Sequence, residues 1–277
     1  MTRGREPGSE VSAKPPAGTT AAAGPPAITI RDVTYQYPNG TQALGGVSLE
    51  VAKGETIGVV GPSGCGKSTL LSVLAGLARP TQGSLSIVRY SRQRHHIGMM
   101  FQKDTLLPWR TVADNVALYW AFHRSLRREA AARVPELLEM VGLAGFAGAY
   151  PHELSGGMRR RVAFLASIAA KPEILLLDEP FSALDEPTRV SILDDVFKIL
   201  REFQMTAVLV THDLAEAVSM SDRVAILTSR PGRVRSVHAV PFGNQRSILE
   251  IRQESEFLKL YGSLWHELSI EIEKSRS

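Results

Sequence analysis

The sequence has very little cysteine: Cys65 is the single thiol among 277 residues. One cysteine cannot form an intramolecular disulfide, so a fold held by internal disulfides is excluded, and a reducing compartment such as the cytosol is the expected environment. Stability must come from a packed core instead. The hydrophobic content of 44% is enough for one large core or two modest ones.

Long apolar runs are also missing. No stretch approaches the roughly 18 to 20 residues needed to span a bilayer. The start, "MTRGREPGSE", lacks the hydrophobic segment of a secretion signal. We therefore expect neither a transmembrane span nor export by the secretory route. Residues 1–27 contain almost no large apolar groups and are rich in Pro, Ala, Gly and Thr, which predicts a disordered N-terminal tail.

No block of one charge sign is present. The 32 Lys and Arg residues and 28 Asp and Glu residues give a net charge of +4, and the basic residues are spread along the chain. Nucleic-acid-binding proteins usually gather basic residues on one face or in one run. Nucleic acid is therefore not an expected partner.

From Ala27 onward, short apolar runs separated by glycine and proline predict alternating strands and helices. A buried strand at 55–61 ends in a glycine loop that leads into a helix pattern at 67–77, which is the context a phosphate-binding loop requires. Residues from about 93 to 170 are expected to be largely helical, forming in part a subdomain inserted into the sheet domain.

Three later segments complete the predicted secondary structure. The apolar runs in "EILLLDEP" (173–180) and "TAVLVTHD" (206–213) predict central parallel strands with polar groups at their carboxyl ends. Residues 246–277 are expected to form an amphipathic helical extension. Its apolar residues recur at spacings of three and four: Leu258, Tyr261, Trp265, Leu268 and Ile272.

The strongest chemical motif is "GPSGCGKST", which fits the phosphate-loop pattern G-x-x-x-x-G-K-[ST]. The glycines allow backbone N–H groups to curl around phosphates, while Lys67 reaches the β and γ phosphates and the Ser68 hydroxyl binds magnesium. A glycine turn without nucleotide function is the alternative. The expected nucleotide-binding residues of this loop are Gly61, Pro62, Ser63, Gly64, Cys65, Gly66, Lys67, Ser68 and Thr69.

Two adjacent carboxylates follow the first of the later strands. Asp178 occupies the position that holds magnesium in P-loop proteins, commonly through water. A second carboxylate at a buried strand end costs desolvation and repulsion, so a purely structural role for Glu179 is disfavoured. We expect Glu179 to be the general base or water-orienting group of a hydrolysis reaction; a helix-capping acid is the alternative.

Two neutral polar side chains are expected at the same sheet edge. His212 follows its own apolar strand and is predicted to contact a γ-phosphate, although an isolated histidine often belongs to the core. Gln102 follows the strand-like run "IGMMF" and offers an amide to a metal ion or to water.

A second Ser-Gly-Gly turn, formed by Ser155, Gly156 and Gly157, begins another predicted helix. N–H groups and a hydroxyl at a helix start make an anion site. Because the first loop surrounds only one side of a triphosphate, this turn could cover the γ end of a nucleotide held by another subunit. A twofold dimer would supply two such sites from one isologous contact.

In their order along the chain, "GPSGCGKST", "FQ", "LSGGM", "ILLLDEP", "SALD" and "THD" are highly specific together. From about residue 28 to 240 the chain resembles the ATP-binding cassette of ABC transporters. The resemblance implies an α/β fold: a P-loop NTPase core of ABC-ATPase type with an antiparallel β part and an inserted helical subdomain. It assigns residues 28–245 to the ATP-binding domain, with ATP and Mg²⁺ as cofactors.

The resemblance also implies roles and partners. Tyr37 would stack on adenine, Gln102 would be the Q-loop glutamine and a metal ligand, "LSGGM" the signature motif, Ser182–Asp185 the D-loop between subunits, and His212 the switch histidine. A head-to-tail dimer would work at the cytoplasmic face of the plasma membrane, bound peripherally to permease subunits and served indirectly by an extracytoplasmic solute-binding protein.

Within this family, "FQKDTLLPWRTVADNV" and "SRPGRV" resemble importers of sulfonates, taurine, nitrate and related solutes. Importers of pyrimidine or thiamine precursors look similar, and a soluble ABC ATPase or a P-loop kinase are rivals from other classes. Residues 106–109 follow the Q-loop where a permease helix usually docks; core packing is their alternative role. The chain departs from many relatives in the signature helix, where Arg160 replaces a glutamine and Ala166 an arginine.

Overall fold

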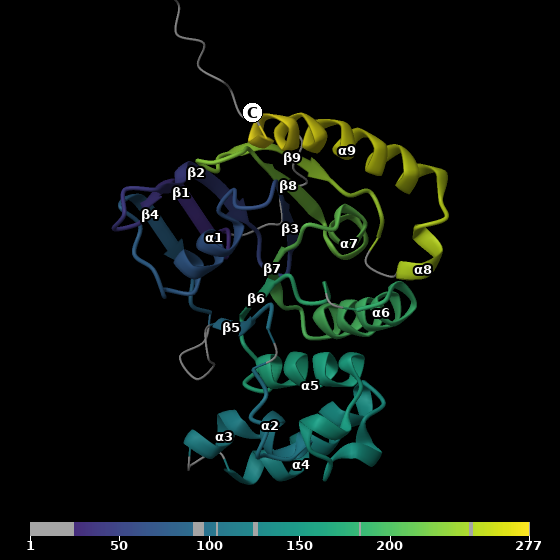
Figure 1. Ribbon diagram of the computed structural model, residues 1–277. Helices are drawn as coiled ribbons and strands as arrows, with labels where there is room; N and C mark the ends of the chain where they lie inside the picture. The colour runs from purple at the N-terminus through teal and green to yellow at the C-terminus, as the bar shows by residue number, and fades with distance from the viewer. Residues whose placement is uncertain are drawn as a thin grey trace, which may run out of the picture.

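The computed structural model describes residues 25–90, 97–103, 105–123, 127–182, 184–243 and 246–276. Most of the expected N-terminal tail, together with Ala183 of the expected D-loop, therefore lies outside the described residues. The described chain forms a central sheet with a smaller antiparallel sheet beside it and a helical layer below it, as Figure 1 shows. This arrangement confirms the predicted fold class.

A six-stranded sheet forms the centre, in the order β5-β6-β7-β3-β8-β9. Neighbouring strands are parallel except for the antiparallel pair β8 and β9. Every residue of β3 and β7 is buried, as expected for parallel strands covered on both faces. The strands are β3 (Thr56–Val60), β5 (Ile97–Met100), β6 (Ile174–Asp178), β7 (Thr206–Val210), β8 (Arg223–Leu227) and β9 (Val234–Ala239).

A three-stranded antiparallel sheet, in the order β2-β1-β4, lies beside this centre. It consists of β1 (Ile28–Gln36), β2 (Gln42–Val51) and β4 (Gln82–Ile87). Its inner side chains pack with α1 (Lys67–Leu74) on one face of the central sheet, where they meet Ile174 and Leu176 of β6. Strand side chains alternate between faces, so Leu175 and Leu177 of β6 point into a different cluster.

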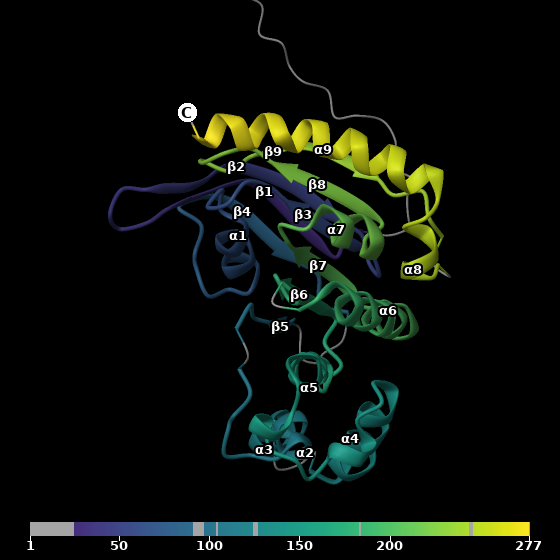
Figure 2. The same cartoon turned by 45° about the vertical axis from the view of Figure 1, so that its right-hand side comes forward.

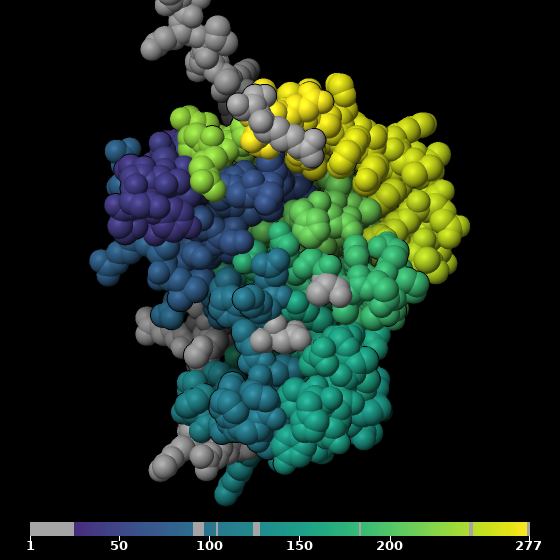
Figure 3. All heavy atoms as spheres, in the orientation of Figure 1, coloured from purple at the N-terminus to yellow at the C-terminus, as the bar shows by residue number. Residues whose placement is uncertain are grey.

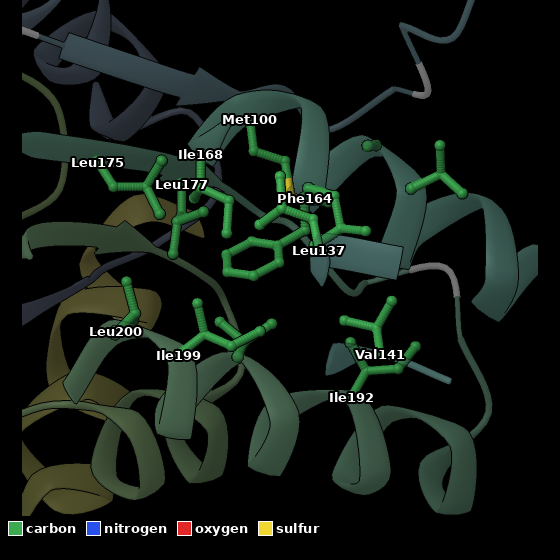
Figure 4. Close-up of a cluster of buried hydrophobic side chains, with 14 of the residues drawn as sticks. Met100, Leu137, Val141, Phe164, Ile168, Leu175, Leu177, Ile192, Ile199 and Leu200 are labelled. Carbon is green, nitrogen blue, oxygen red and sulfur yellow. The ribbon is translucent and has the colours of Figure 1, made fainter. Parts of the chain in front are cut away.

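That second cluster joins the helical layer to the sheet. Figure 4 shows the Phe164 ring of α5 among side chains of β6 and α6. The fully buried Phe164 makes α5 a component of the main core, although the helical residues before it form an insertion. The helices on this side are α2 (Val112–Val116), α3 (Leu118–Phe122), α4 (Arg127–Met140), α5 (Gly156–Ile168) and α6 (Glu186–Glu202), with 3-10 turns at Ala144–Phe146 and Pro151–Glu153.

The chain ends in α7 (Leu214–Met220), β8, β9, α8 (Ile248–Ile251) and α9 (Ser255–Arg276). Figure 2 shows α9 lying along β8 and β9 at the side of the molecule opposite α4. Its apolar side chains pack with α7, β3 and β8 in a third core cluster. No helix within the described residues combines the length and the hydropathy needed to span a bilayer.

The predicted helix at the C-terminal end is present, but its predicted buried face is only partly right. Leu268 is buried, whereas Leu258 and Trp265 are 60% and 49% exposed. The buried stripe instead contains Phe257 and Leu264. The same face carries Glu267 and Glu271, which bind polar groups of β9 and the preceding turn. Apolar spacing alone cannot locate a face that acidic residues help to define.

Candidate nucleotide site

A cavity of about 630 Å³ opens where the antiparallel sheet, the P-loop and the carboxyl ends of the central strands meet. Two of its lining residues, Ala43 and Arg230, were not among the predicted site residues. The predicted residues that line it are Tyr37, Ser63, Gly64, Gly66, Lys67, Ser68, Thr69, Gln102, Glu179 and His212. The structure therefore gathers into one cavity predicted residues that are up to 175 positions apart, from Tyr37 to His212.

The P-loop runs from the end of β3 to the start of α1, and glycine is required within it. Gly66 has a φ of +108°, and a Cβ atom there would lie 2.7 Å from the carbonyl oxygen of Ala43. A Cβ atom on Gly61 would lie 2.8 Å from Sγ of Cys65, which is itself buried. Side chains at these two glycines would open the loop.

Lys67 lies beneath the loop. Its Nζ donates hydrogen bonds to the carbonyl oxygens of Gly61 at 2.8 Å and Pro62 at 3.0 Å. Only 7% of the residue is exposed, so its ammonium charge is held inside the ring of backbone. An ammonium group has three donors, which leaves one N–H for an anion placed in the loop.

Ser68 and Asp178 form a pair at the start of α1 and the end of β6. The Ser68 hydroxyl donates to Oδ1 of Asp178 at 3.0 Å. Burial raises the pKa of Asp178, and the nearby charge of Glu179 raises it further, although the Ser68 hydrogen bond lowers it. Among the described residues no group of three or more His, Cys, Asp or Glu side chains could hold a metal ion. A hydroxyl and one carboxylate match the sparse protein ligation of Mg²⁺, which relies on phosphates and water for the rest.

Glu179 is the centre of a three-residue cluster. Its Oε2 accepts a hydrogen bond from Nε2 of Gln102 at 3.0 Å and lies 3.1 Å from Nδ1 of His212. These residues follow β5, β6 and β7, which are neighbours in the sheet. The His212 side chain is 60% exposed, so the alternative of a core histidine is wrong. The Glu179 carboxylate faces the cavity, so the alternative of a helix cap is not supported.

The backbone of Glu179 is held in an uncommon conformation. Its φ is +44°, in the left-handed region that side chains usually avoid. Its N–H donates to the carbonyl oxygen of Val210 at 2.8 Å, which anchors the strained residue to β7. Strain of this kind concentrates at functional sites, where the surrounding structure fixes a side chain in one direction.

Tyr37 stands at the mouth of the cavity. Its hydroxyl is 2.8 Å from Oγ1 of Thr69, and its ring packs edge-on against Tyr35. Tyr37 remains 41% exposed. An exposed aromatic ring tied to the first turn of α1 is a suitable platform for a planar base.

The Ser-Gly-Gly turn does not line this cavity. The Ser155 hydroxyl instead caps α5 by accepting a hydrogen bond from the N–H of Met158 at 3.2 Å. Asp185 likewise caps α6 through the N–H of Thr188, at 3.2 Å. In the single chain both residues therefore have a local role as helix caps, and neither lines the cavity that contains the P-loop.

Two arginines contact the site in ways that the sequence pattern did not indicate. Nε of Arg230 donates to the carbonyl oxygen of Gly64 at 3.0 Å. The buried Arg160 donates to the backbone carbonyl oxygens of Phe101 and Gln102, so its guanidinium group connects the signature helix to the Q-loop. These two hydrogen bonds give a structural role to Arg160, the residue that replaces a glutamine of many relatives. Nothing in the structure explains Ala166.

A buried acid contacts Thr211, the residue before His212. Glu216 of α7 is 1% exposed and accepts a hydrogen bond from Oγ1 of Thr211 at 2.7 Å, while its Oε1 has no partner among the described residues. Burial raises its pKa to about 7 from an ordinary 4.5; the Thr211 bond lowers the pKa and the charge of Asp213 raises it. Below about pH 7 the native protein therefore favours the protonated form of Glu216.

This raised pKa predicts a pH dependence of stability. The contribution of Glu216 is fully present below pH 4.5 and is lost as the pH rises through about 7. We expect Glu216→Gln to remove that slope and to raise the free energy of unfolding at pH 8 by up to about 3 kcal/mol. Urea unfolding at pH 5.5, 7 and 8 measures the difference between variant and parent. Parallel pH profiles would contradict the assignment.

Comparison with known proteins places this site in a family. The profile of the ABC transporter family matches residues 44–182. YtlC of Bacillus subtilis, an ABC transporter ATP-binding protein, is 41% identical over 248 residues, which cover 87% of this chain and 95% of the relative. The aliphatic sulfonates import ATP-binding protein SsuB of Bacillus licheniformis is 45% identical over 211 residues, covering 75% and 82%. The nitrate import ATP-binding protein NrtC of Synechococcus elongatus is 42% identical over 239 residues, covering 83% of this chain but 36% of the longer relative.

Solved structures similar to this chain belong to the same kind of protein. The ATP-binding cassette MJ0796, in a dimeric post-hydrolysis state with ADP and Pi, is 32% identical with a TM-score of 0.66, covering 78% of this chain and all of that one. The structure of cbiO1 from Clostridium perfringens has a TM-score of 0.71 at 26% identity, covering 86% and 94%. With the cavity and P-loop described above, these likenesses show that the chain belongs to the ABC transporter family, as one of its ATP-binding cassette ATPases.

Proposed function

We propose that the chain powers the uptake of a small solute, such as a sulfonate, taurine or nitrate, through a separate permease. The observation that carries the ATPase part is the cluster of Gln102, Glu179 and His212 at the edge of the P-loop cavity. Support for uptake comes from relatives named as import proteins for sulfonates, taurine and nitrate. An importer of a pyrimidine or thiamine precursor, or a soluble ABC ATPase, is the alternative.

The proposed binding roles follow from the positions of the side chains. Tyr37 stacks on the adenine ring, and the P-loop N–H groups with Lys67 bind the phosphates. Ser68 and Asp178 are the residues that would hold Mg²⁺, with Gln102 as a further ligand. When bound there, Mg²⁺ supplies positive charge to phosphate oxygens.

Hydrolysis is assigned to Glu179. Its carboxylate is aimed into the cavity and orients a water molecule, from which it accepts a proton as the water attacks the γ-phosphate. His212 holds the carboxylate from one side and stabilises charge that develops on the phosphate. Gln102 holds the carboxylate from the other side through its amide N–H. The backbone of Glu179, held by its hydrogen bond to Val210, fixes the direction of the carboxylate between His212 and Gln102.

The second half of the site comes from another copy of the chain. Ser155 and Gly156 lie at the start of α5, outside the cavity of their own subunit, where the helix N-terminus can receive an anion. In a head-to-tail dimer, this turn covers the γ-phosphate held by the partner's P-loop, and the segment ending at Asp185 lies between the subunits. Such a dimer binds peripherally to permease subunits at the cytoplasmic face of the membrane, and an extracytoplasmic protein delivers the solute to the permease.

Membrane fractions and a deletion strain test this proposal. We expect the chain to copurify from detergent-solubilised membranes with a multi-span permease, and the deletion strain to lose growth on taurine, an alkanesulfonate or nitrate as sole sulfur or nitrogen source. A plasmid copy should restore growth, while the matched copy carrying Lys67→Ala should not. An ATPase found without any permease, and normal growth of the deletion strain on every such solute, would favour the soluble alternative.

A further inference from the structure

A turn after β8 is fastened to the strand that borders the P-loop. The turn comprises residues 229–233, with the sequence SRPGR. The N–H of Gly232 donates to the carbonyl oxygen of Ala43 at 2.9 Å, and its own carbonyl accepts the N–H of Gly45 at 2.9 Å. In Figure 3 the yellow-green atoms of this region lie between the purple and blue antiparallel part and the yellow α9. The turn is therefore a fixed part of the structure around the cavity.

The same turn contacts the P-loop directly. A Cβ atom on Gly232 would lie only 2.2 Å from the carbonyl oxygen of Cys65, so the two backbones are in close contact. Nε of Arg230 donates to the carbonyl oxygen of Gly64 at 3.0 Å. Two successive carbonyls of the phosphate loop are thus contacted by one turn.

Arg230 lines the cavity together with Lys67 and Ser63. Its Nη2 lies beside Gly64 of the P-loop, 3.1 Å from the position that a Cβ atom on that glycine would take. Only Nε is used by the P-loop, and the two terminal amino groups make no hydrogen bond or ion pair with the described residues. This fork of N–H donors has the geometry and the charge that bind phosphate oxygens.

The other side of the turn is held by the C-terminal helix. The N–H of Ser229 donates to Oε2 of Glu271 at 3.1 Å, while the second carboxylate oxygen binds the Arg235 guanidinium group and Nζ of Lys274, the latter at 2.8 Å. Glu271 is 1% exposed. Burial raises its pKa, but the bonds from Lys274, Ser229 and Arg235 outweigh burial and lower the pKa overall. The carboxylate is therefore a charged anchor for the turn.

We propose that Arg230 is a further nucleotide-binding residue, directed at the phosphate oxygens of ATP, and that Glu271 of α9 positions it by fixing the turn against the P-loop. The C-terminal extension is then a structural part of the nucleotide site. This inference rests on the proposed nucleotide site. It gives the SRPGR segment and α9 a role in ATP binding. Neither segment takes part in the proposed dimer contact or in the cluster of Gln102, Glu179 and His212.

The test compares ATP dissociation constants, KM and kcat for single variants of the full-length chain. We expect Arg230→Ala to weaken ATP binding about tenfold, the usual effect of losing a charge-assisted hydrogen bond, with kcat changed less than about threefold. Arg230→Lys should recover part of the affinity. Glu271→Gln should weaken binding in the same direction, and adding it to Arg230→Ala should cause little further loss. Because Arg230 is exposed, its variants test the inference even if a Glu271 variant does not fold.

A matched control exists on the same helix. Glu267 accepts a hydrogen bond from Oγ of Ser236 at 2.7 Å and forms ion pairs with Nε2 of His238 at 3.1 Å and Nε of Arg235 at 4.0 Å, and all three of these partners lie on β9 rather than in the 229–233 turn. Glu267→Gln should therefore lower thermal stability and leave ATP affinity unchanged. If Arg230→Ala leaves affinity unchanged, or if Glu271→Gln affects only stability as Glu267→Gln does, the inference is wrong. Lys67→Ala distinguishes failure of the Arg230 inference from failure of the proposed nucleotide site. Unchanged ATP binding in Lys67→Ala would overturn the nucleotide site itself.

Discussion

Glu179→Gln is expected to bind ATP as tightly as the parent protein and to hydrolyse it about 10² to 10³ times more slowly, since general base catalysis typically contributes 10²- to 10⁴-fold. Glutamine has the size of glutamate and can keep the contacts with Gln102 and His212, but it cannot accept a proton from water. Single-turnover hydrolysis measures the loss, and titration with ATP measures the binding. Size-exclusion chromatography with magnesium and ATP should show the variant accumulating as a dimer.

The control for this prediction is a glutamate of the same charge away from the cavity. Glu139 is exposed on α4, so Glu139→Gln should hydrolyse ATP at the parent rate. His212→Ala should also reduce turnover while leaving the fold intact, because its side chain is exposed and holds the Glu179 carboxylate. Turnover at the parent rate in Glu179→Gln would remove the assignment of Glu179 as the base. It would leave the P-loop assignments untouched.

The strands that the sequence predicts most directly are those whose side chains all face one kind of environment. β6 and β7 are buried on both faces, so their continuous apolar runs identify them without any knowledge of their neighbours. β4 and β9 are largely exposed or half-buried, with mixed polar sequences. Their pairing with β1 and β8 defines them as strands, and such long-range pairing leaves no local pattern.

The candidate site also contains residues that the sequence predicts and residues that it does not. Gln102, Glu179 and His212 follow apolar strands that end at one edge of a parallel sheet, so their convergence is predictable from sequence. Arg160 and Arg230 act on backbone carbonyl oxygens of distant loops. A carbonyl is present at every position of the chain, so no residue type marks the partner. The contacts of these two arginines therefore leave no pattern in the sequence.

A mixture of two inactive variants is expected to recover hydrolysis. Lys67→Ala removes the ammonium group from the P-loop, and Gly156→Asp places a carboxylate where the proposed dimer receives a phosphate. In a mixed dimer, the intact P-loop of one chain faces the intact signature turn of the other, so one of two sites is complete. Random pairing makes half of the dimers mixed, which predicts about a quarter of the parent activity from an isologous pair.

Gly156 is a better site than Gly157 for the substitution in the mixing experiment, because a change at Gly156 does not disturb packing. A Cβ atom on Gly157 would lie 2.7 Å from Cγ2 of Thr188, so a substitution there disturbs the packing of α5 on α6. A Cβ atom on Gly156 would have no neighbour closer than 3.8 Å, and an acidic residue in the first turn of a helix is stabilising. Gly156→Asp should therefore fold with a thermal stability at least equal to that of the parent protein, and Gly156→Ala serves as its uncharged control. Hydrolysis by Gly156→Asp alone, or a mixture no more active than its two components, would mean that each chain completes its own site, and the proposed dimer would have to be abandoned.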